Sequence, residues 1–449
     1  MHACCRANKR LATFDSSLPS RLLDCLRTWV SMDGGSPMQT VLSAPGVKDK
    51  KLVSFTRNDD ATNDKDAVTG LIRSIVGGAT PSSPAQRTAF HVFHINTVVD
   101  LFSAWRRGLP DVRPYYAVKC NPEPALLGAL AALGAGFDCA SRAEMEAVLA
   151  LGVPPGRIVY ANPCKPEPHL EYAAGAGVSL ATYDTEDEVA KVARCHPGCQ
   201  LLLRLKAPDG GVSGGDLMNK YGAHAHEVAP LLRAAQRAGV GVAGVSFHVG
   251  SPVSRVDVYR GAIQAARAAF DQAVALGMPP MRVLDVGGGF TAGAAFDEAA
   301  AVIRDALDRS FRDLRPCVEV VAEPGRYFAT TAFTLAARVI GRRARGAARE
   351  YWIDDGVYGS LNNVLMDHKA PRPRPLASCP RPGEETYAST VFGPTCDSQD
   401  KVVTGYQLPE MSVGDWLVFD DMGAYSTSAG SRFNGFDSSE IKIYVAYSS

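Results

Sequence analysis

Lys119 is the residue of this chain that could most directly do chemistry. It ends the apolar run at 114–118, and Asn121-Pro122 then breaks that run. A buried strand with this pattern delivers one amine to the mouth of a pocket. We expect burial to lower the pKa of the lysine, so that the amine can form a Schiff base with a carbonyl. Lysine is seldom buried, so a strand that ends in solvent is the competing interpretation.

Similar apolar runs recur between residues 85 and 326 and alternate with longer amphipathic stretches. The eight runs lie at 115–118, 135–139, 158–161, 180–183, 201–205, 244–248, 283–286 and 318–322. Eight strands that alternate with helices are the count of a (β/α)8 barrel. A doubly wound open sheet shows the same alternation, so the count alone leaves both architectures open.

Polar residues lie at or just beyond the ends of these runs. They are Lys119, Asp138, Asn162, Arg204, His248, the triplet Gly287, Gly288 and Gly289, and the segment Glu323-Pro324-Gly325-Arg326. In a barrel all these ends meet on one face, which is where barrel enzymes carry their active sites. An open sheet would spread them along an edge. The pattern therefore predicts an α/β fold with a (β/α)8 TIM barrel and a second, all-β domain.

The glycine triplet and its neighbours suggest an anion site beside an aromatic ring. Consecutive glycines let backbone N–H groups approach phosphate oxygens, although a tight turn explains a triplet equally well. Arg326 could neutralise such a phosphate, and Ser251 could donate a hydroxyl bond. Glu323 could keep a pyridine nitrogen protonated, and His248 could lie on the ring face. Their alternatives are a structural ion pair for Glu323 and a core position for His248.

Composition excludes several classes of protein. The chain has 449 residues, 46% of them hydrophobic, which is ample for a large core. Lys and Arg number 47, as do Asp and Glu, which argues against a bulk nucleic-acid or anionic-membrane binder. No apolar stretch reaches the length of a membrane span. The 11 cysteines lack CxxC spacing, so we expect a reduced protein without a disulfide framework or a zinc site.

We expect four parts along the chain: a disordered or targeting extension at 1–37, strands of the β domain and a linker at 38–84, the barrel at 85–326, and the C-terminal β domain at 327–449. Short strands are expected at 333–340, 350–353, 387–391, 416–419 and 441–447. Loops are expected at 58–64, at 369–385 and, as a mobile segment, at 210–215. The extension has few acidic residues, so a plastid transit peptide is an alternative to the cytoplasmic location that we expect.

Beyond single positions, whole motifs resemble eukaryotic ornithine decarboxylases of the plant type. The motifs are PYYAVKCN at 114–121, GFDCAS at 136–141, YANPCK at 160–165, SFHVGS at 246–251, DVGGGF at 285–290, AEPGRY at 322–327, DDGVYGSLNNVLMDH at 354–368, GPTCDSQD at 393–400, DDMGAY at 420–425 and FNGF at 433–436. The resemblance covers roughly residues 85–449. It implies decarboxylation of L-ornithine to putrescine and carbon dioxide with pyridoxal 5′-phosphate, the first step of polyamine biosynthesis.

The resemblance also implies roles for individual residues. The implied catalytic residues are Lys119, His248, Glu323 and Cys396. The implied cofactor contacts are Lys119, Asp138, Arg204, His248, Ser251, Gly287, Gly288, Gly289, Glu323, Gly325, Arg326 and Tyr425. The implied substrate contacts are Tyr358, Met366, Asp367, Asp397 and Phe433. Cys396 would return a proton to the substrate carbon, a role that suits a thiol; a free cysteine more often serves as a small buried hydrophobe.

The implied partners are L-ornithine, a second copy of the chain and an antizyme-type regulator. In the implied homodimer the active sites are shared, and Cys396 and Asp397 reach the cofactor bound to the partner's Lys119. Neither nucleic acid nor a membrane is expected as a partner. The alternatives are a lysine decarboxylase that makes cadaverine and a non-catalytic protein resembling the antizyme inhibitors.

Three positions depart from the family pattern. Pro252 follows Ser251 where a glycine is usual, and Met366 stands where many relatives carry tyrosine. His91 and His94 are paired in AFHVFHIN, which raises the question of a metal. Alternation along a strand places side chains at i and i+3 on opposite faces, so we expect no metal there.

Overall fold

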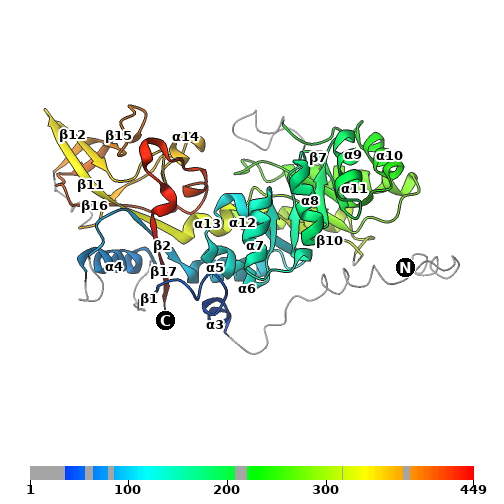
Figure 1. Cartoon of the computed structure of the whole chain (residues 1–449), viewed down its shortest axis with the longest axis horizontal. Helices are drawn as coiled ribbons and strands as arrows, with labels where there is room; N and C mark the ends of the chain where they lie inside the picture. Colours follow the sequence, from blue (N-terminus) through cyan, green and yellow to red (C-terminus); the bar gives the residue numbers. More distant parts are fainter. Residues whose placement is uncertain are drawn as a thin grey trace. The chain divides into compact units, whose positions relative to one another are not determined.

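Eight parallel strands close into the barrel that the strand-end residues predicted (Figure 1). Their order around the barrel is β10-β3-β4-β5-β6-β7-β8-β9. The strands are β3 (Val112–Ala117), β4 (Gly136–Cys139), β5 (Ile158–Tyr160), β6 (Leu180–Tyr183), β7 (Gln200–Lys206), β8 (Gly241–His248), β9 (Val283–Asp285) and β10 (Glu319–Ala322). Each of the eight predicted runs overlaps one of these strands, so the barrel prediction is confirmed.

The computed structural model describes residues 36–55, 64–78, 85–207, 220–315, 317–377 and 385–448. The expected extension at 1–37 lies outside this part of the chain except for its last two residues, as do most of the loop at 58–64 and the whole mobile loop at 210–215. The described part belongs to one structural unit.

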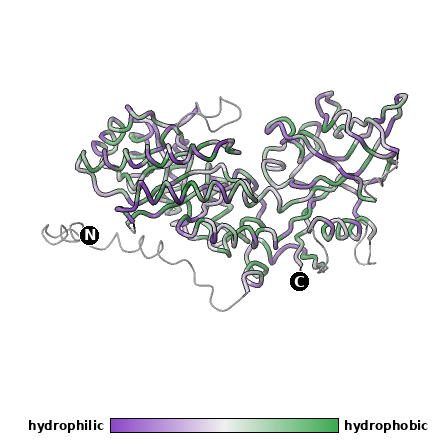
Figure 2. Tube along the Cα trace, turned by 180° about the vertical axis from the view of Figure 1, so that it is seen from behind, coloured by the Kyte–Doolittle hydropathy of each residue, from purple (hydrophilic) through white to green (hydrophobic). Residues whose placement is uncertain are grey.

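Helices cover the outside of the barrel, between successive strands. They are α5 (Ile95–Gly108), α6 (Pro124–Leu133), α7 (Arg142–Ala150), α8 (Glu167–Ala176), α9 (Glu186–Cys195), α10 (Val228–Ala238), α11 (Val258–Ala275) and α12 (Ala294–Ser310). Side-chain caps start three of them: Glu123 accepts from the Ala125 N–H, Ser141 from the Glu144 N–H, and Thr185 from the Glu188 N–H. Hydrophilic and hydrophobic stretches alternate along these helices, as expected for elements with one face on the barrel (Figure 2).

A second, nine-stranded sheet is assembled from both ends of the chain. Its main order is β1-β17-β2-β11-β12-β14-β15, with β16 paired to β11 and β13 paired to β16. The strands are β1 (Leu52–Phe55), β2 (Phe90–His94), β11 (Phe333–Arg345), β12 (Ala348–Ile353), β13 (Arg374–Pro375), β14 (Thr386–Phe392), β15 (Lys401–Pro409), β16 (Trp416–Phe419) and β17 (Lys442–Ser448). The five strands expected after residue 327 are all present.

Three details of this second domain differ from the sequence prediction. Strand β2 lies in the second sheet, between β17 and β11, so the barrel begins at β3 and not at residue 85. Among the described residues of 38–80, β1 is the only strand of the sheet; α3 (Pro37–Leu42) and α4 (Asp64–Gly77) take up most of the others. Two strands were not predicted: β13 lies inside the loop expected at 369–385, and Gly405 with several exposed polar residues weakens the alternation of β15.

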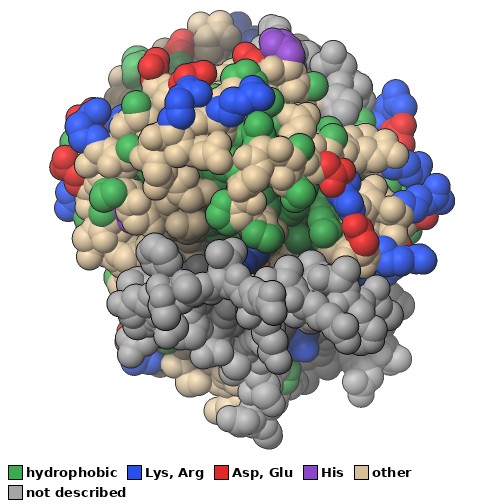
Figure 3. Space-filling model, turned by 90° about the vertical axis from the view of Figure 1, so that its right-hand side faces the viewer, with side chains coloured by type: hydrophobic (Ala, Val, Ile, Leu, Met, Phe, Trp, Pro, Cys, Tyr) green, Lys and Arg blue, Asp and Glu red, His purple; other side chains and the backbone are tan. Residues whose placement is uncertain are grey.

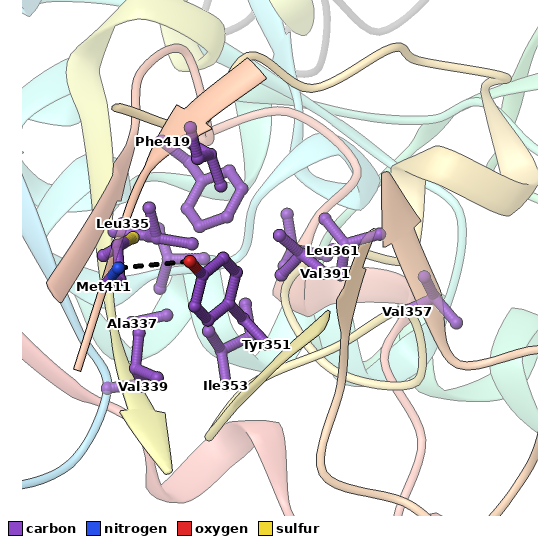
Figure 4. Close-up of a cluster of buried hydrophobic side chains, with 14 of the residues drawn as sticks. Leu335, Ala337, Val339, Tyr351, Ile353, Val357, Leu361, Val391, Met411 and Phe419 are labelled. Carbon is purple, nitrogen blue, oxygen red and sulfur yellow. Dashed lines mark hydrogen bonds between the residues drawn. The ribbon is translucent and has the colours of Figure 1, made fainter. Parts of the chain in front are cut away.

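A cluster of buried side chains holds the second domain together around Tyr351 (Figure 4). The ring is fully buried, and its hydroxyl accepts a hydrogen bond of 3.1 Å from the Met411 N–H. Val357 and Leu361 belong to the same cluster and flank the segment that carries Tyr358. Core packing therefore anchors the ends of a loop that was predicted to contact substrate.

The surface shows no dominant sign of charge on the face drawn in Figure 3, where basic and acidic side chains are interspersed. This agrees with the equal numbers of basic and acidic residues. Within the described ranges, no helix combines the length and the apolar character that crossing a membrane would require.

Candidate active site

Lys119 lies directly after β3, in a single 3₁₀ turn formed by Val118–Cys120. Its amine donates a short hydrogen bond to Asp138 Oδ2 on the neighbouring strand β4. The Lys119 side chain is 42% exposed, whereas the Asp138 side chain is completely buried. The lysine therefore reaches from an accessible barrel mouth onto a buried carboxylate.

The pKa of Lys119 is raised above its ordinary range, which corrects the prediction of a lowered pKa. Burial alone would lower it, but the hydrogen-bonded charge of Asp138, with smaller electrostatic contributions from Glu323 and Tyr425, outweighs that effect. The pairing of Lys119 with Asp138 depends on the register of β3 and β4, which the local sequence does not reveal.

Glu323 follows β10, and its carboxyl group acts electrostatically on that of Asp285, the last residue of β9. The pKa of Glu323 is raised well above its ordinary range by burial and then by the charges of Asp285 and Asp138. Burial also raises the pKa of Asp285, to about 6. Glu323 Oε1 has no hydrogen-bond partner within the described residues. A buried acceptor of this kind is costly unless a ligand supplies a donor.

His248 is the last residue of β8, and its Nδ1 accepts a hydrogen bond of 2.9 Å from the Gly250 N–H. Burial lowers the pKa of His248 well below its ordinary range, and the positive charges of Arg204 and Lys119 lower it further. The ring is therefore neutral at physiological pH, which suits a flat contact with another aromatic ring.

The glycine triplet forms a loop that tolerates no side chains. Gly287 has φ +69° and Gly289 has φ +103°, in the left-handed region that favours glycine. A Cβ on Gly288 would lie 2.7 Å from His248 Nε2 and 2.8 Å from the Glu323 carbonyl oxygen. The loop therefore keeps the space between His248 and Glu323 open.

Arg326 contacts both Ser251, which was predicted to bind a phosphate, and Asp367, which was predicted to bind the substrate. Its Nε donates to Ser251 Oγ at 3.0 Å, and its guanidinium lies 4.4 Å from the centre of the Tyr425 ring. The two terminal nitrogens bond both oxygens of Asp367, at 2.6 and 2.9 Å. This bidentate pair was not predicted, since Arg326 was assigned to a phosphate and Asp367 to an ammonium group.

The segment that carries Lys119 is tied to the second domain. The Cys120 carbonyl accepts hydrogen bonds from the Tyr425 N–H at 2.9 Å and from Ser428 Oγ at 3.2 Å. Asn121 Nδ2 donates to the Gly423 carbonyl at 2.8 Å. Both domains therefore fix the position of the amine.

The remaining predicted residues form a second cluster on the β domain. Tyr358 donates a short hydrogen bond to Asp397 and stacks on Phe433, with ring centres 4.6 Å apart. Cys396 is exposed, and its N–H donates to Asn434 Oδ1 at 3.1 Å. Among the described residues, no hydrogen bond or ion pair joins this cluster to Lys119 or Asp138.

Three other predicted residues take distinct positions. Arg204 lies in β7 and acts through its charge on His248 and Glu323. Gly325 packs so tightly that a Cβ would lie 2.9 Å from Cys120 Cβ. Met366, the last residue of α14 (Asn363–Met366), is 70% exposed.

The barrel-mouth residues fit pyridoxal 5′-phosphate. Lys119 supplies an amine for the aldehyde, and Glu323 supplies an unpaired buried acceptor for a ring N–H. Asp138 Oδ1 is a second unpaired buried acceptor. Ser251 and Arg326 supply donors for a phosphate.

Sequence reasoning missed two residues of these clusters. Asp285 stands directly before the glycine triplet in DVGGGF, and Asn434 follows Phe433 in FNGF. Both lie inside recognised motifs, but only the fold shows that the charge of Asp285 acts on Glu323 and that Asn434 contacts Cys396.

The paired histidines have separate partners. His91 Nε2 lies 3.0 Å from Ser360 Oγ, while His94 Nδ1 lies 3.0 Å from Thr97 Oγ1. The two rings therefore do not form a common ligand set.

Comparison with known proteins agrees with this site. Residues 95–330 match the family described as pyridoxal-dependent decarboxylase, pyridoxal binding domain. An ornithine decarboxylase, chloroplastic, of Nicotiana glauca is 49% identical over 422 residues, which cover 92% of this chain and 94% of that protein. An ornithine decarboxylase of Rattus norvegicus is 42% identical, over 82% of this chain and 83% of that protein.

Solved structures of similar fold are also pyridoxal-dependent decarboxylases. An arginine decarboxylase of Paramecium bursaria Chlorella virus, bound to agmatine, superposes with a TM-score of 0.78 at 35% identity, over 84% of this chain and 100% of that chain. A lysine/ornithine decarboxylase of Vibrio vulnificus gives a TM-score of 0.75 at 27% identity, over 87% and 99%. With its barrel, its lysine and its matching relatives, the chain belongs to the pyridoxal-dependent decarboxylase family that includes the ornithine decarboxylases.

Proposed function

We propose that this chain decarboxylates L-ornithine to putrescine and carbon dioxide, using pyridoxal 5′-phosphate. The main support for this proposal is the cluster of Lys119, Asp138 and Glu323 at the barrel mouth. The chain that carries it is 42–51% identical to several ornithine decarboxylases. A lysine decarboxylase and a non-catalytic binding protein are not favoured. Carbon dioxide release from ornithine, lysine and arginine by the pure protein tests the proposal, and ornithine should be the best substrate.

The position of each site residue determines its role in the proposed reaction. The bound cofactor supplies an electron sink for the charge left when carbon dioxide departs. Glu323 holds a proton at the ring nitrogen, and the neutral His248 supports the ring face. Ser251, Arg326 and the N–H groups of the glycine loop bind the phosphate. Asp138 orients the Lys119 amine.

Substrate binding depends on how Arg326 is shared. A bound phosphate competes with Asp367 for the guanidinium, because both are anions that prefer the same bidentate geometry. With a phosphate bound at Arg326, the Asp367 carboxylate would be free to accept from the distal ammonium of ornithine together with the partner's Asp397. Tyr358 and Phe433 line the space beside Asp397.

The two clusters come together in a homodimer. Cys396 is exposed and Asp397 is half-buried, and apolar side chains of the same domain are exposed near them: Leu365 is 41%, Met366 70%, Phe433 41% and Phe436 47% exposed. Exposed apolar side chains beside a site that lacks some of its residues favour contact with another protein surface. In the proposed dimer this surface covers the barrel mouth of the partner. Cys396 then returns the proton to the substrate carbon.

Cofactor attachment should be visible by chemical labelling. Borohydride treatment of the yellow holoenzyme should fix the cofactor on the peptide that contains Lys119, because this amine lies nearest to the buried carboxylates. Peptide mapping by mass spectrometry is the measurement. Label on another peptide, or no label, would contradict the assignment of Lys119.

Substrate length should be discriminated only in part. One added methylene changes binding by about 1–3 kcal/mol, so lysine should be a weak second substrate. Met366 is flexible and lacks a ring, so Met366→Tyr should raise the preference for ornithine. The ratio of kcat/KM for the two substrates is the measurement. A wild-type enzyme that prefers lysine would contradict the assignment of ornithine as the substrate. An unchanged ratio in the variant would show that Met366 does not form part of the substrate pocket.

We also propose the four-part organisation given above, with two amendments: the barrel begins at β3, and β2 belongs to the second sheet.

The location is proposed as cytoplasmic, with the plastid as the alternative because two relatives are described as chloroplastic. Imaging of a fluorescent protein fused behind residues 1–37 decides between them. An antizyme-type regulator is a proposed partner, testable by pull-down with a purified antizyme.

A further inference from the structure

The segment that carries Asp367 has little packing within its own protomer. Asp367 directly follows α14, and its neighbours Met366 and His368 are both exposed. Leu365, one turn earlier, is exposed as well. Because exposed side chains contribute little burial energy, the position of the Asp367 carboxylate depends on the hydrogen bonds that hold this segment.

Lys369 joins this segment to the residues that follow β16. Its amine donates a hydrogen bond of 2.5 Å to the Asp421 carbonyl oxygen. Arg374 adds a neighbouring link, because its guanidinium lies 3.3 Å from the Asp420 carboxylate. The part of the chain around Asp367 is therefore bonded to residues 420 and 421 by two basic side chains.

The same residues, 420–425, hold the cofactor side of the site. The centre of the Tyr425 ring lies 4.4 Å from the Arg326 guanidinium. The Tyr425 N–H donates at 2.9 Å to the carbonyl of Cys120, the residue after Lys119. Lys369 thus connects the segment of the predicted substrate carboxylate with the segment that positions the Schiff-base lysine.

The backbone on both sides of the Lys369 hydrogen bond adopts a costly conformation. His368, directly before Lys369, has φ +51°, and Asp421, which supplies the carbonyl oxygen, has φ +59°. Left-handed conformations of residues other than glycine cost energy and persist where the surrounding contacts hold them. Two of them at one contact indicate that this hydrogen bond is a defined feature of the fold.

Lys369 lies close to Asp367 without occupying its carboxylate. Burial lowers the pKa of Lys369, and the charges of Arg326 and Asp367 are among those that act on its amine. The amine is bonded to a carbonyl oxygen, whereas both Asp367 oxygens accept from Arg326. The hold that Lys369 provides is therefore independent of the contact that a phosphate would contest.

We propose that Lys369 is a positioning residue that determines how well the site recognises the second amine of its substrate. By holding its segment on residues 420 and 421, Lys369 keeps the Asp367 carboxylate at a fixed place relative to Lys119. The inference rests on the proposed function, because it requires that Asp367 accepts from the distal ammonium of ornithine or putrescine.

Calorimetric titration of the holoenzyme with putrescine and with n-butylamine tests the proposal, because only putrescine has a second ammonium for Asp367. Lys369→Met keeps most of the side-chain length but removes the donor. It should weaken putrescine binding about tenfold, the scale of one hydrogen bond, and leave n-butylamine binding unchanged. Lys369→Arg keeps a donor and should restore most of the affinity. Lys442→Met, on the exposed edge of β17, is the matched control and should bind both ligands as wild type does.

Unchanged or tighter putrescine binding by Lys369→Met would overturn the proposal, as would an equal loss of both ligands, which would show a role in folding alone. If Lys369→Met fails to fold, Arg374→Gln decides, because loss of the neighbouring link should also weaken putrescine and spare n-butylamine. Carbon dioxide release from ornithine by wild type is measured separately, so a failure of the proposed reaction remains distinguishable. In the active enzyme Lys369→Met should raise KM for ornithine and leave kcat nearly unchanged.

Discussion

Lys119→Ala and Cys396→Ala proteins, each nearly inactive alone, should regain activity when they are mixed and allowed to exchange subunits. After exchange about half of the dimers are heterodimers, and each heterodimer has one intact site, so roughly a quarter of the wild-type activity should return. The physical reason is the separation of the two clusters: Lys119 contacts Asp138 inside the barrel, while Cys396 lies exposed beside Asn434 on the second domain.

Subunit exchange must be shown independently, with differently tagged protomers and native mass spectrometry. A matched mixture of Lys119→Ala with Asp138→Ala should not recover, because both residues belong to the same cluster and no heterodimer then contains an intact site. Proven exchange without recovery in the first mixture would place the whole site within one chain.

Glu323→Gln should lower kcat by about 10²-fold or more, the scale for losing one preorganised charged contact at a reacting centre. Glu323 is buried, its pKa is raised, and its Oε1 has no partner among the described residues, so it is placed to meet a ring N–H. Glutamine keeps the shape but cannot hold the proton on the ring nitrogen.

The measurement for Glu323→Gln is kcat together with the absorbance spectrum of the bound cofactor, which reports the protonation of the ring. A changed spectrum with lost activity supports the role. Glu319→Gln is the control: Glu319 lies on the same strand β10 but pairs with Arg113 at 3.2 Å, so its substitution should leave the spectrum unchanged. A Glu323→Gln enzyme with normal kcat would contradict the role of Glu323.

Much of the architecture followed from the sequence because the periodic signal was strong. Eight buried parallel strands read as short apolar runs, and in a barrel their ends must converge. Lys119, Asp138, His248 and Glu323 could therefore be assigned to one site before any contact was known. The C-terminal strands were predicted on the same grounds, except the two-residue strand β13 and strand β15, whose alternation is interrupted by exposed polar residues.

The tertiary structure decided what depends on contacts between distant segments. The pKa of Lys119 rises because β3 and β4 set Asp138 beside the amine, an effect opposite to the desolvation that sequence reasoning considered. Arg326 and Asp367, 41 positions apart, form a pair that no motif predicted. Strand β2 joins the second sheet through partners at both ends of that domain. Periodicity reports which face of a segment is buried, but charge pairing and strand partners are set by long-range register, which a single sequence does not encode locally.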